Sequence, residues 1–218
     1  MKIRSLVPAV VLSTVIAPAT AVAETTANFG WVSDYIFRGL FQEDSSASAG
    51  VDYTHDSGFY VGTWGADVGQ GLETDLYLGF ARGDKFTYKI GFTGYYYTDD
   101  FDDTYSEVNL GLGYGIFALD VAIGQYDGRG VPADYTFTSV TISPEKGPYY
   151  RIGSWSDDFE PLGEYFELGY TYTLEGPDVD LSITLWHAPD SPLGDLDDNE
   201  SGDSKLTFGI KKNISFGD

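Results

Sequence analysis

Three consecutive residues have the types that acyl transfer needs. His55, Asp56 and Ser57 place an imidazole, a carboxylate and a hydroxyl side by side. A serine nucleophile needs an imidazole beside its hydroxyl and a third group that orients the ring. The same residues, followed by a glycine, are also typical of a tight turn between two strands. The other histidine, His187, follows a tryptophan at the end of an apolar segment. We expect a turn at residues 55–57, no catalytic residues and no enzyme activity.

Acidic clusters are the second feature that could hold a ligand. The segment 195–203, DLDDNESGD, is the richest of them in carboxylates. Carboxylate oxygens are Ca²⁺ ligands, but this segment lacks the spaced ligands and the glycine of an EF-hand loop. The chain has no cysteine, and its sequence has neither a Cys/His cluster nor a glycine-rich phosphate loop. We therefore predict solvated acidic loops, with no metal site and no cofactor.

A repeated strand pattern must position these residues. After about residue 25, segments of about ten residues alternate apolar with small or polar side chains. In the segment 86–93, for example, Phe86, Tyr88, Ile90 and Phe92 occupy every second position. A period of two places such residues on one face of a strand. In a membrane barrel that face meets lipid, while the opposite, polar face lines the lumen.

The whole pattern predicts an all-β fold, a transmembrane antiparallel β-barrel of about 12 strands. We expect strands at 26–40, 47–55, 58–68, 73–81, 85–98, 105–114, 116–126, 135–142, 149–155, 164–174, 179–187 and 205–216. Their connections are alternately short and long, and the long ones are 41–46, 69–72, 99–104, 127–134, 156–163 and 188–204. Short periplasmic turns and longer extracellular loops are typical of outer-membrane barrels, so we predict that the N- and C-termini are both periplasmic.

Charged residues on the predicted inner face are the candidate site. They are eight acids and five bases: Asp34, Arg38, Asp52, Glu73, Asp75, Lys89, Glu107, Asp120, Arg151, Glu167, Asp180, Lys205 and Lys211. Charges in a narrow lumen must be hydrated or paired, because lone burial is unfavourable. We interpret them as pore-lining residues that tune selectivity. The alternative is a paired network that fills a barrel with little or no pore.

Two of these residues and the long loops bear on selectivity. Asp34 and Arg38 share one face at a spacing of four, which suits either part of a selectivity ring or an ion pair between strands. The loops 99–104, 156–163 and 188–204 collect acids at one rim. A negative rim concentrates cations and repels anions, so we predict a cation preference if the lumen is open.

The first residues and the composition indicate where the protein acts. Lys2 and Arg4, an apolar stretch at 6–16 and the small residues 21–23 are typical of a secretory signal peptide. We predict a signal peptide at 1–23 and one barrel domain at 24–218. The net charge of -22 argues against nucleic acid as a partner, because the phosphate backbone would repel the protein. The expected location is the outer membrane of a Gram-negative cell.

The start of the predicted barrel also resembles a known family. The stretches ANFGWVSDYIFRGLFQED (27–44) and VDYTHDSGFYVGTW (51–64) are similar to the TorF family of bacterial porins, in which an SDYxFRG segment leads to a GFYxGTW segment. Phe41-Gln42 stands where family members usually have Ser-Gln. The resemblance is specific over about residues 27 to 68 and looser to the C-terminus. It implies an outer-membrane protein that transports solutes.

Together these observations predict a monomeric porin surrounded by outer-membrane lipid. Small hydrophilic solutes, with cations preferred, would cross it by passive diffusion. One alternative is a closed structural or partner-binding barrel without a pore. Another is a soluble periplasmic β-sandwich that carries a signal peptide.

Overall fold

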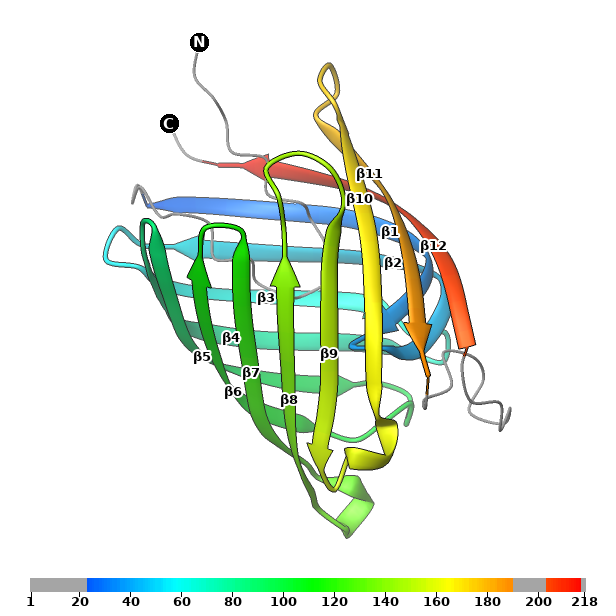
Figure 1. Ribbon diagram of the computed structural model, residues 1–218. Coiled ribbons are helices and arrows are strands. Elements are labelled where there is room, and N and C mark those ends of the chain that lie inside the picture. The colour runs from blue at the N-terminus through cyan, green and yellow to red at the C-terminus, as the bar shows by residue number, and fades with distance from the viewer. Residues whose placement is uncertain (1–22, 190–202, 217–218) are drawn as a thin grey trace.

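A closed barrel of twelve strands forms the protein in the computed structural model, which describes residues 23–189 and 203–216 (Figure 1). The strands are β1 (Glu24–Phe37), β2 (Leu40–Thr54), β3 (Phe59–Asp67), β4 (Leu72–Gly83), β5 (Phe86–Tyr97), β6 (Tyr105–Tyr114), β7 (Phe117–Tyr126), β8 (Ala133–Ile142), β9 (Tyr149–Asp157), β10 (Glu164–Leu174), β11 (Val179–Ala188) and β12 (Asp203–Ser215). All pairings between neighbours are antiparallel, and β1 pairs with β12 to close the sheet. The predicted all-β barrel of 12 strands is confirmed.

Helices are short and few in the described ranges. The 3₁₀ helices η1 (Gly128–Gly130) and η2 (Glu160–Leu162) lie in two of the longer connections. Within residues 23–189 and 203–216, no helix is long and apolar enough to cross a membrane.

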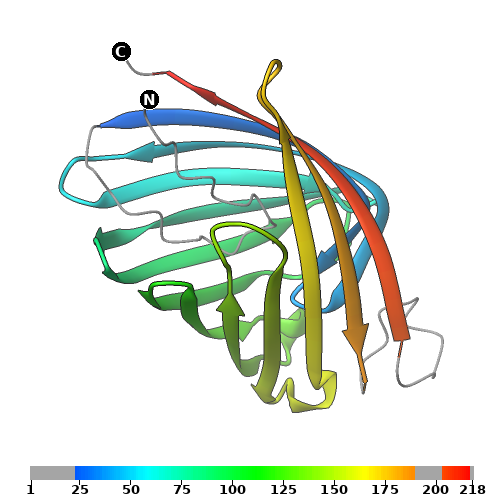
Figure 2. The same cartoon turned by 45° about the horizontal axis from the view of Figure 1, so that its top comes forward.

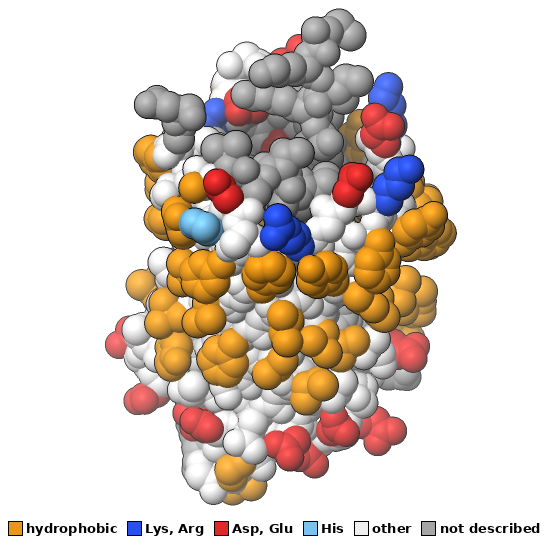
Figure 3. All heavy atoms as spheres, turned by 90° about the vertical axis from the view of Figure 1, so that its left-hand side faces the viewer, with side chains coloured by type: hydrophobic (Ala, Val, Ile, Leu, Met, Phe, Trp, Pro, Cys, Tyr) orange, Lys and Arg blue, Asp and Glu red, His pale blue; other side chains and the backbone are white. Residues whose placement is uncertain are grey.

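The predicted alternation of side chains separates the outside of the wall from the inside. Phe92 on β5 is 45% exposed, whereas the next residue, Thr93, is 6% exposed. Figure 3 shows apolar side chains gathered in a broad band over one side of the barrel, with charged groups above and below it. An exposed apolar surface of this extent needs lipid. Closure suits that environment, because the pairing of β1 with β12 removes the free sheet edges that an open sheet would have.

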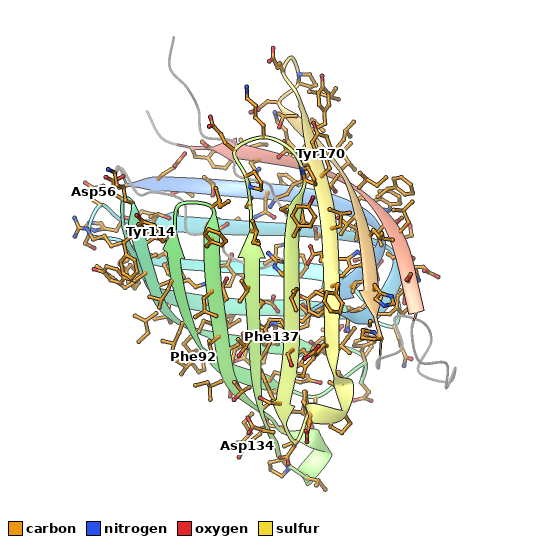
Figure 4. All side chains as sticks on the ribbon, in the orientation of Figure 1. Asp56, Phe92, Tyr114, Asp134, Phe137 and Tyr170 are labelled. Atoms are coloured by element: carbon orange, nitrogen blue, oxygen red, sulfur yellow. The ribbon has the colours of Figure 1, made fainter. Side chains whose placement is uncertain are left out.

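The two ends of the barrel have different connections. The turn rim carries both described chain ends and the short connections 55–58, 84–85, 115–116, 143–148 and 175–178. The loop rim, at the opposite end, carries the connections 68–71, 98–104, 127–132 and 158–163. Figure 4 labels Asp56 on the turn rim and Asp134 on the loop rim. Most of the predicted acidic loop 188–204 lies outside the described residues.

One part of the wall departs from the predicted strands. The sequence predicts one strand at 26–40 and a loop at 41–46, but β1 ends at Phe37 and β2 begins at Leu40. Arg38 and Gly39 form the turn between them, with φ angles of 50° and 83°. Positive φ at both central residues is the requirement of a type I′ hairpin turn. Residues 41–46 are therefore strand, and this part of the prediction is wrong.

This turn belongs to a hairpin that leaves the wall. The β1–β12 pairing ends at Val32, opposite Gly209, and the β2–β3 pairing begins at Ser48, opposite Ala66. Between these points the strands pair with one another only, from Val32–Ser46 to Phe37–Leu40. We call residues 33–47 the inner hairpin, because its tip contacts the far side of the lumen. Figures 1 and 2 both show the loop-rim ends of β1 and β2 curling into the barrel.

Aromatic side chains pack around the inner hairpin. Ile36 is 1% exposed and lies in a buried cluster with Tyr135, Phe137, Trp155, Tyr165 and Trp186, among others. On the other side of the hairpin, Tyr35 is 2% exposed and packs with Ala66 and Val68. Most wall residues of both clusters come from the loop-rim ends of their strands. The lumen near the loop rim is therefore occupied by the hairpin and its aromatic neighbours.

Candidate functional site

A cavity of about 400 Å³ lies inside the barrel, beside the inner hairpin. We call it the chamber. Of the charged residues predicted to line a pore, the following line the chamber: Asp34, Arg38, Asp52, Lys89, Glu107, Asp120, Arg151 and Lys211. The other five, Glu73, Asp75, Glu167, Asp180 and Lys205, are on the inner face but outside the chamber lining. Whether a solute passes any of them stays a prediction.

Arg38 and Glu107 form the central ion pair of the lumen. Arg38 Nη1 donates to Glu107 Oε2 over 2.8 Å, and Nη2 donates to Oε1 over 2.7 Å. Glu107 also accepts hydrogen bonds from Tyr95 Oη, Tyr135 Oη and Asn109 Nδ2, at 2.8, 2.9 and 2.6 Å. The Glu107 side chain is fully buried. A buried carboxylate with this many donors is strongly stabilised in its ionised form.

The tip of the inner hairpin is held by further contacts. The Arg38 guanidinium lies 4.6 Å from the ring centre of Phe137 on β8. The Trp155 indole on β9 donates through Nε1 to the Arg38 carbonyl over 3.0 Å. A Cβ added to Gly39 would lie 2.7 Å from the Tyr165 ring on β10. The tip therefore contacts β6, β8, β9 and β10, across the lumen from the strands that carry it.

Other bases on the inner face also pair with acids of different strands. Lys89 lies 3.2 Å from Asp120, and Arg151 lies 3.1 Å from Glu167. Arg151 in addition donates to Thr141 over 2.9 Å, and Glu167 accepts a short hydrogen bond from Tyr149. These contacts join β5 to β7 and β8 to β10. The predicted alternative of a paired network is thus present in part.

Asp34 and Arg38 do not pair with each other. Lys205 on β12 lies 2.8 Å from Asp34, and its ammonium lies 4.0 Å from the ring centre of Phe41. Arg38 instead reaches Glu107. The spacing of four that placed Asp34 and Arg38 together in the sequence brings them onto one hairpin, where each binds a different wall strand.

Glu73 and Asp75, the two buried acids on β4, have fewer hydrogen-bond partners than Glu107. Glu73 is 2% exposed and accepts a hydrogen bond from Tyr35 Oη over 2.7 Å. Asp75 is completely buried, and among the described residues neither of its carboxylate oxygens has a hydrogen-bond partner. Asp75 interacts electrostatically with Glu73 and Glu107, which repel it, and with Arg38, which attracts it. A buried carboxyl group without a hydrogen-bond partner is unfavourable whether it is ionised or neutral, so the docked hairpin buries Asp75 at a cost in free energy.

The turn-rim side of the chamber is polar and carries both signs of charge. Asp52 accepts hydrogen bonds from Tyr77 Oη over 2.5 Å and from Asn28 Nδ2 over 3.5 Å. Lys211, from β12, also lines the chamber and interacts electrostatically with Asp52 and Asp180. Such a lining offers donors and acceptors to a small hydrophilic molecule.

The segment at His55 is a turn, as the sequence predicts. Ser57 Oγ lies 3.0 Å from His55 Nδ1, and the Ser57 backbone N–H donates to the same nitrogen over 3.1 Å. All three residues from His55 to Ser57 are exposed at the turn rim. The backbone hydrogen bond makes Nδ1 an acceptor, which is ordinary turn geometry. Elsewhere in the described chain, no group of three His, Cys, Asp or Glu side chains could hold a metal ion.

Sequence reasoning missed the inner hairpin and the aromatic residues that receive it. The usable signal was the position of these residues. Tyr135 and Phe137 stand in register with Ser139 and Thr141 on the inner face of β8. Large rings at positions where a narrow channel needs small side chains indicate that something fills the lumen there.

The fold is similar to those of solved membrane proteins. A membrane-protein structure from work on in-meso crystallization has a TM-score of 0.59 and 11% identity, over 88% of this chain and 84% of that chain. The COG4313 outer membrane channel from Pseudomonas putida F1 has a TM-score of 0.49 and 10% identity, over 94% of this chain and 100% of that one. Outer membrane phospholipase A from Escherichia coli has a TM-score of 0.46 and 12% identity, over 92% and 94%. At these identities the likeness concerns the fold alone.

The closed barrel and its apolar exterior support the predicted location in the outer membrane. No curated protein matches the chain in sequence. A family model described as a bacterial protein of unknown function, Gcw_chp, matches residues 16–142, which is more than half of the chain. The chain therefore belongs to the Gcw_chp family of bacterial proteins.

Proposed function

We propose that this barrel is a passive channel for small hydrophilic solutes in the outer membrane. The observation that carries the proposal is the chamber, a cavity of about 400 Å³ that is lined by charged residues of both signs, such as Asp52 and Lys211, and enclosed by a membrane-type wall. A cavity of this volume accommodates a small molecule rather than a folded partner. The resemblance of residues 27–68 to the TorF porins supports the same function.

Cation preference is the finer part of the proposal. The loop rim carries Asp99, Asp100, Asp102 and Asp103 in the connection 98–104, and Asp158 and Glu160 near η2. A rim of one sign raises the local concentration of the opposite ion and lowers that of like ions. Inside the lumen, acids outnumber bases among the predicted pore-lining residues. Both features favour K⁺ over Cl⁻.

The orientation and the processing of the chain belong to the same proposal. The turn rim would face the periplasm and the loop rim the cell exterior, because outer-membrane barrels have short periplasmic turns. Residues 1–23 would be removed as a signal peptide, which leaves one monomeric barrel domain.

Single-channel recording tests the proposal. The purified protein is first shown to be folded by its heat-dependent shift in gel migration, and is then added to a planar bilayer. We expect stepwise conductance in KCl and a reversal potential of the sign that K⁺ selectivity gives in a salt gradient. A boiled sample is the control. A folded protein with no conductance contradicts the channel, and a reversal potential of the opposite sign contradicts the cation preference alone.

The inner hairpin supports a second candidate function, a closed barrel that binds a partner or stabilises the membrane. Its tip contacts the opposite wall, and aromatic side chains occupy the lumen near the loop rim. Such a barrel would conduct no ions in any condition. Uptake of sugars into proteoliposomes separates the two functions, because a closed barrel leaves the rate at that of protein-free vesicles.

A further inference from the structure

The inner hairpin is attached to the wall by a different kind of bond from the rest of the barrel. Where the β1–β12 ladder stops, the Phe208 backbone N–H donates to Ser33 Oγ over 2.9 Å. Where the β2–β3 ladder has not yet begun, Ser46 Oγ donates to the Asp67 carbonyl over 2.7 Å. Two serine hydroxyls thus replace the strand ladder at the base of the hairpin. A base held by single side-chain bonds can hinge without unpairing the wall.

The tip carries the bidentate ion pair of the docked hairpin, while Tyr35 and Asp34 bind Glu73 and Lys205 along its sides. Arg38 makes both hydrogen bonds to Glu107 and receives the Trp155 indole on its carbonyl. Bidentate bonds between a guanidinium and a carboxylate are among the strongest polar contacts in proteins and depend on geometry. Arg38 therefore makes the strongest single polar contact of the docked hairpin.

Asp75 opposes docking. Its carboxyl group is buried under the hairpin without a donor in the described structure, it is repelled by Glu73 and Glu107, and the guanidinium of Arg38, which attracts it, is already bound to Glu107. No water-sized space touches the Asp75 oxygens, so the docked state leaves no place for a hydrated counterion. Among the described residues, Asp75 also interacts electrostatically with four tyrosines: Tyr35 on β1, Tyr77 on β4, and Tyr95 and Tyr97 on β5.

We propose that the inner hairpin is a displaceable gate, latched by the Arg38–Glu107 pair and pushed open by the buried, unpartnered carboxyl group of Asp75. Undocking exposes Asp75 to water, which removes its desolvation penalty. It also removes the hairpin from the lumen near the loop rim and connects the chamber with that rim. The effect on transport rests on the proposed channel function, but the movement of the hairpin does not.

Chemical labelling of a buried position measures the movement directly. The chain has no cysteine, so a single introduced thiol gives a clean signal. Ala66 is 2% exposed, packs against Tyr35 of the hairpin and does not line the chamber. In the variant Ala66→Cys, a charged, water-soluble methanethiosulfonate reagent reaches the thiol only when the hairpin has left. Asp56→Cys, on the exposed turn rim, is the control for reagent activity.

Three substitutions in the Ala66→Cys background test the latch and the opposing charge. Arg38→Ala should raise the labelling rate about tenfold or more, because two charge-assisted hydrogen bonds are lost. Glu107→Gln removes the same ion pair from the wall side and should raise the labelling rate similarly. It tests the pair even if the Arg38→Ala protein does not fold. Asp75→Asn should lower the rate several-fold below that of the parent.

The outcomes separate the gate from the channel. The gate is overturned if the parent, Arg38→Ala and Glu107→Gln proteins are labelled at equal rates while the control thiol is reactive. An unchanged rate in Asp75→Asn overturns the role of Asp75. Bilayer recordings on the same proteins then show whether faster labelling is matched by a higher open probability. Faster labelling without conductance supports the gate and contradicts the channel. Conductance with equal labelling rates in all variants supports the channel and contradicts the gate.

Discussion

Removal of the Arg38 side chain should destabilise the barrel strongly. The guanidinium makes two hydrogen bonds of 2.7 and 2.8 Å to Glu107, and the two side chains are 14% and 0% exposed. Breaking a buried ion pair by deleting one partner typically costs about 3–5 kcal/mol. Because Tyr95, Tyr135 and Asn109 still donate to Glu107, we expect Arg38→Ala to lower the free energy of unfolding by ~3 kcal/mol, the lower end of that range.

Urea unfolding in phospholipid vesicles, followed by tryptophan fluorescence, measures this loss. Lys212→Ala is the matched control, because Lys212 lies 3.9 Å from Asp178 at the turn rim and the two side chains are 36% and 65% exposed. Exposed ion pairs contribute about 1 kcal/mol or less. A double-mutant cycle with Glu107→Gln should return a coupling energy of at least ~1.5 kcal/mol between positions 38 and 107. If Arg38→Ala is no more destabilising than Lys212→Ala, the latch assigned to this pair is refuted.

Three further perturbations test the wall, the hairpin turn and the rim. Leu110→Arg, on the lipid face of β6, should lower the free energy of unfolding by about 2–4 kcal/mol in the same urea assay. Tyr114→Arg, near the turn rim, should lower it by ~1 kcal/mol or less. Equal losses would argue against the assigned position of the apolar band in the membrane. Gly39→Ala should lower the thermal midpoint more than Gly147→Ala, since both have positive φ but only Gly39 faces a ring within 3 Å. Replacing all aspartates of the connection 98–104 by asparagine should move the reversal potential toward zero, and an unchanged potential would place cation selection elsewhere.

The wall of this barrel is predictable from the sequence. Alternation with a period of two is a local property, so it locates twelve strands and assigns a face to each side chain without reference to distant contacts. Phe92 and Thr93 show the result, one exposed and one buried. Strand ends are less accurate, and the largest error is at Arg38 and Gly39, where alternation continues through the turn.

The arrangement inside the lumen could not be predicted in the same way. The face of each charged residue follows from local alternation, but its partner depends on the tilt of distant strands and on the inward bend of the hairpin. Asp34 and Arg38 illustrate the limit. Their spacing of four suggests a shared role, whereas the structure pairs them with Lys205 and Glu107, from strands far apart in the sequence.

The position of the inner hairpin near the N-terminus also has a consequence for the order of folding. Its contacts with Glu107 and Trp155 join residues that are 69 and 117 positions apart. Contacts so distant in the chain form only after the loop-closure entropy of the intervening segment has been overcome. The hairpin is therefore synthesised among the first strands but docks among the last. The hairpin can dock only in a molecule in which β6 to β9 have already formed, because its tip contacts those strands.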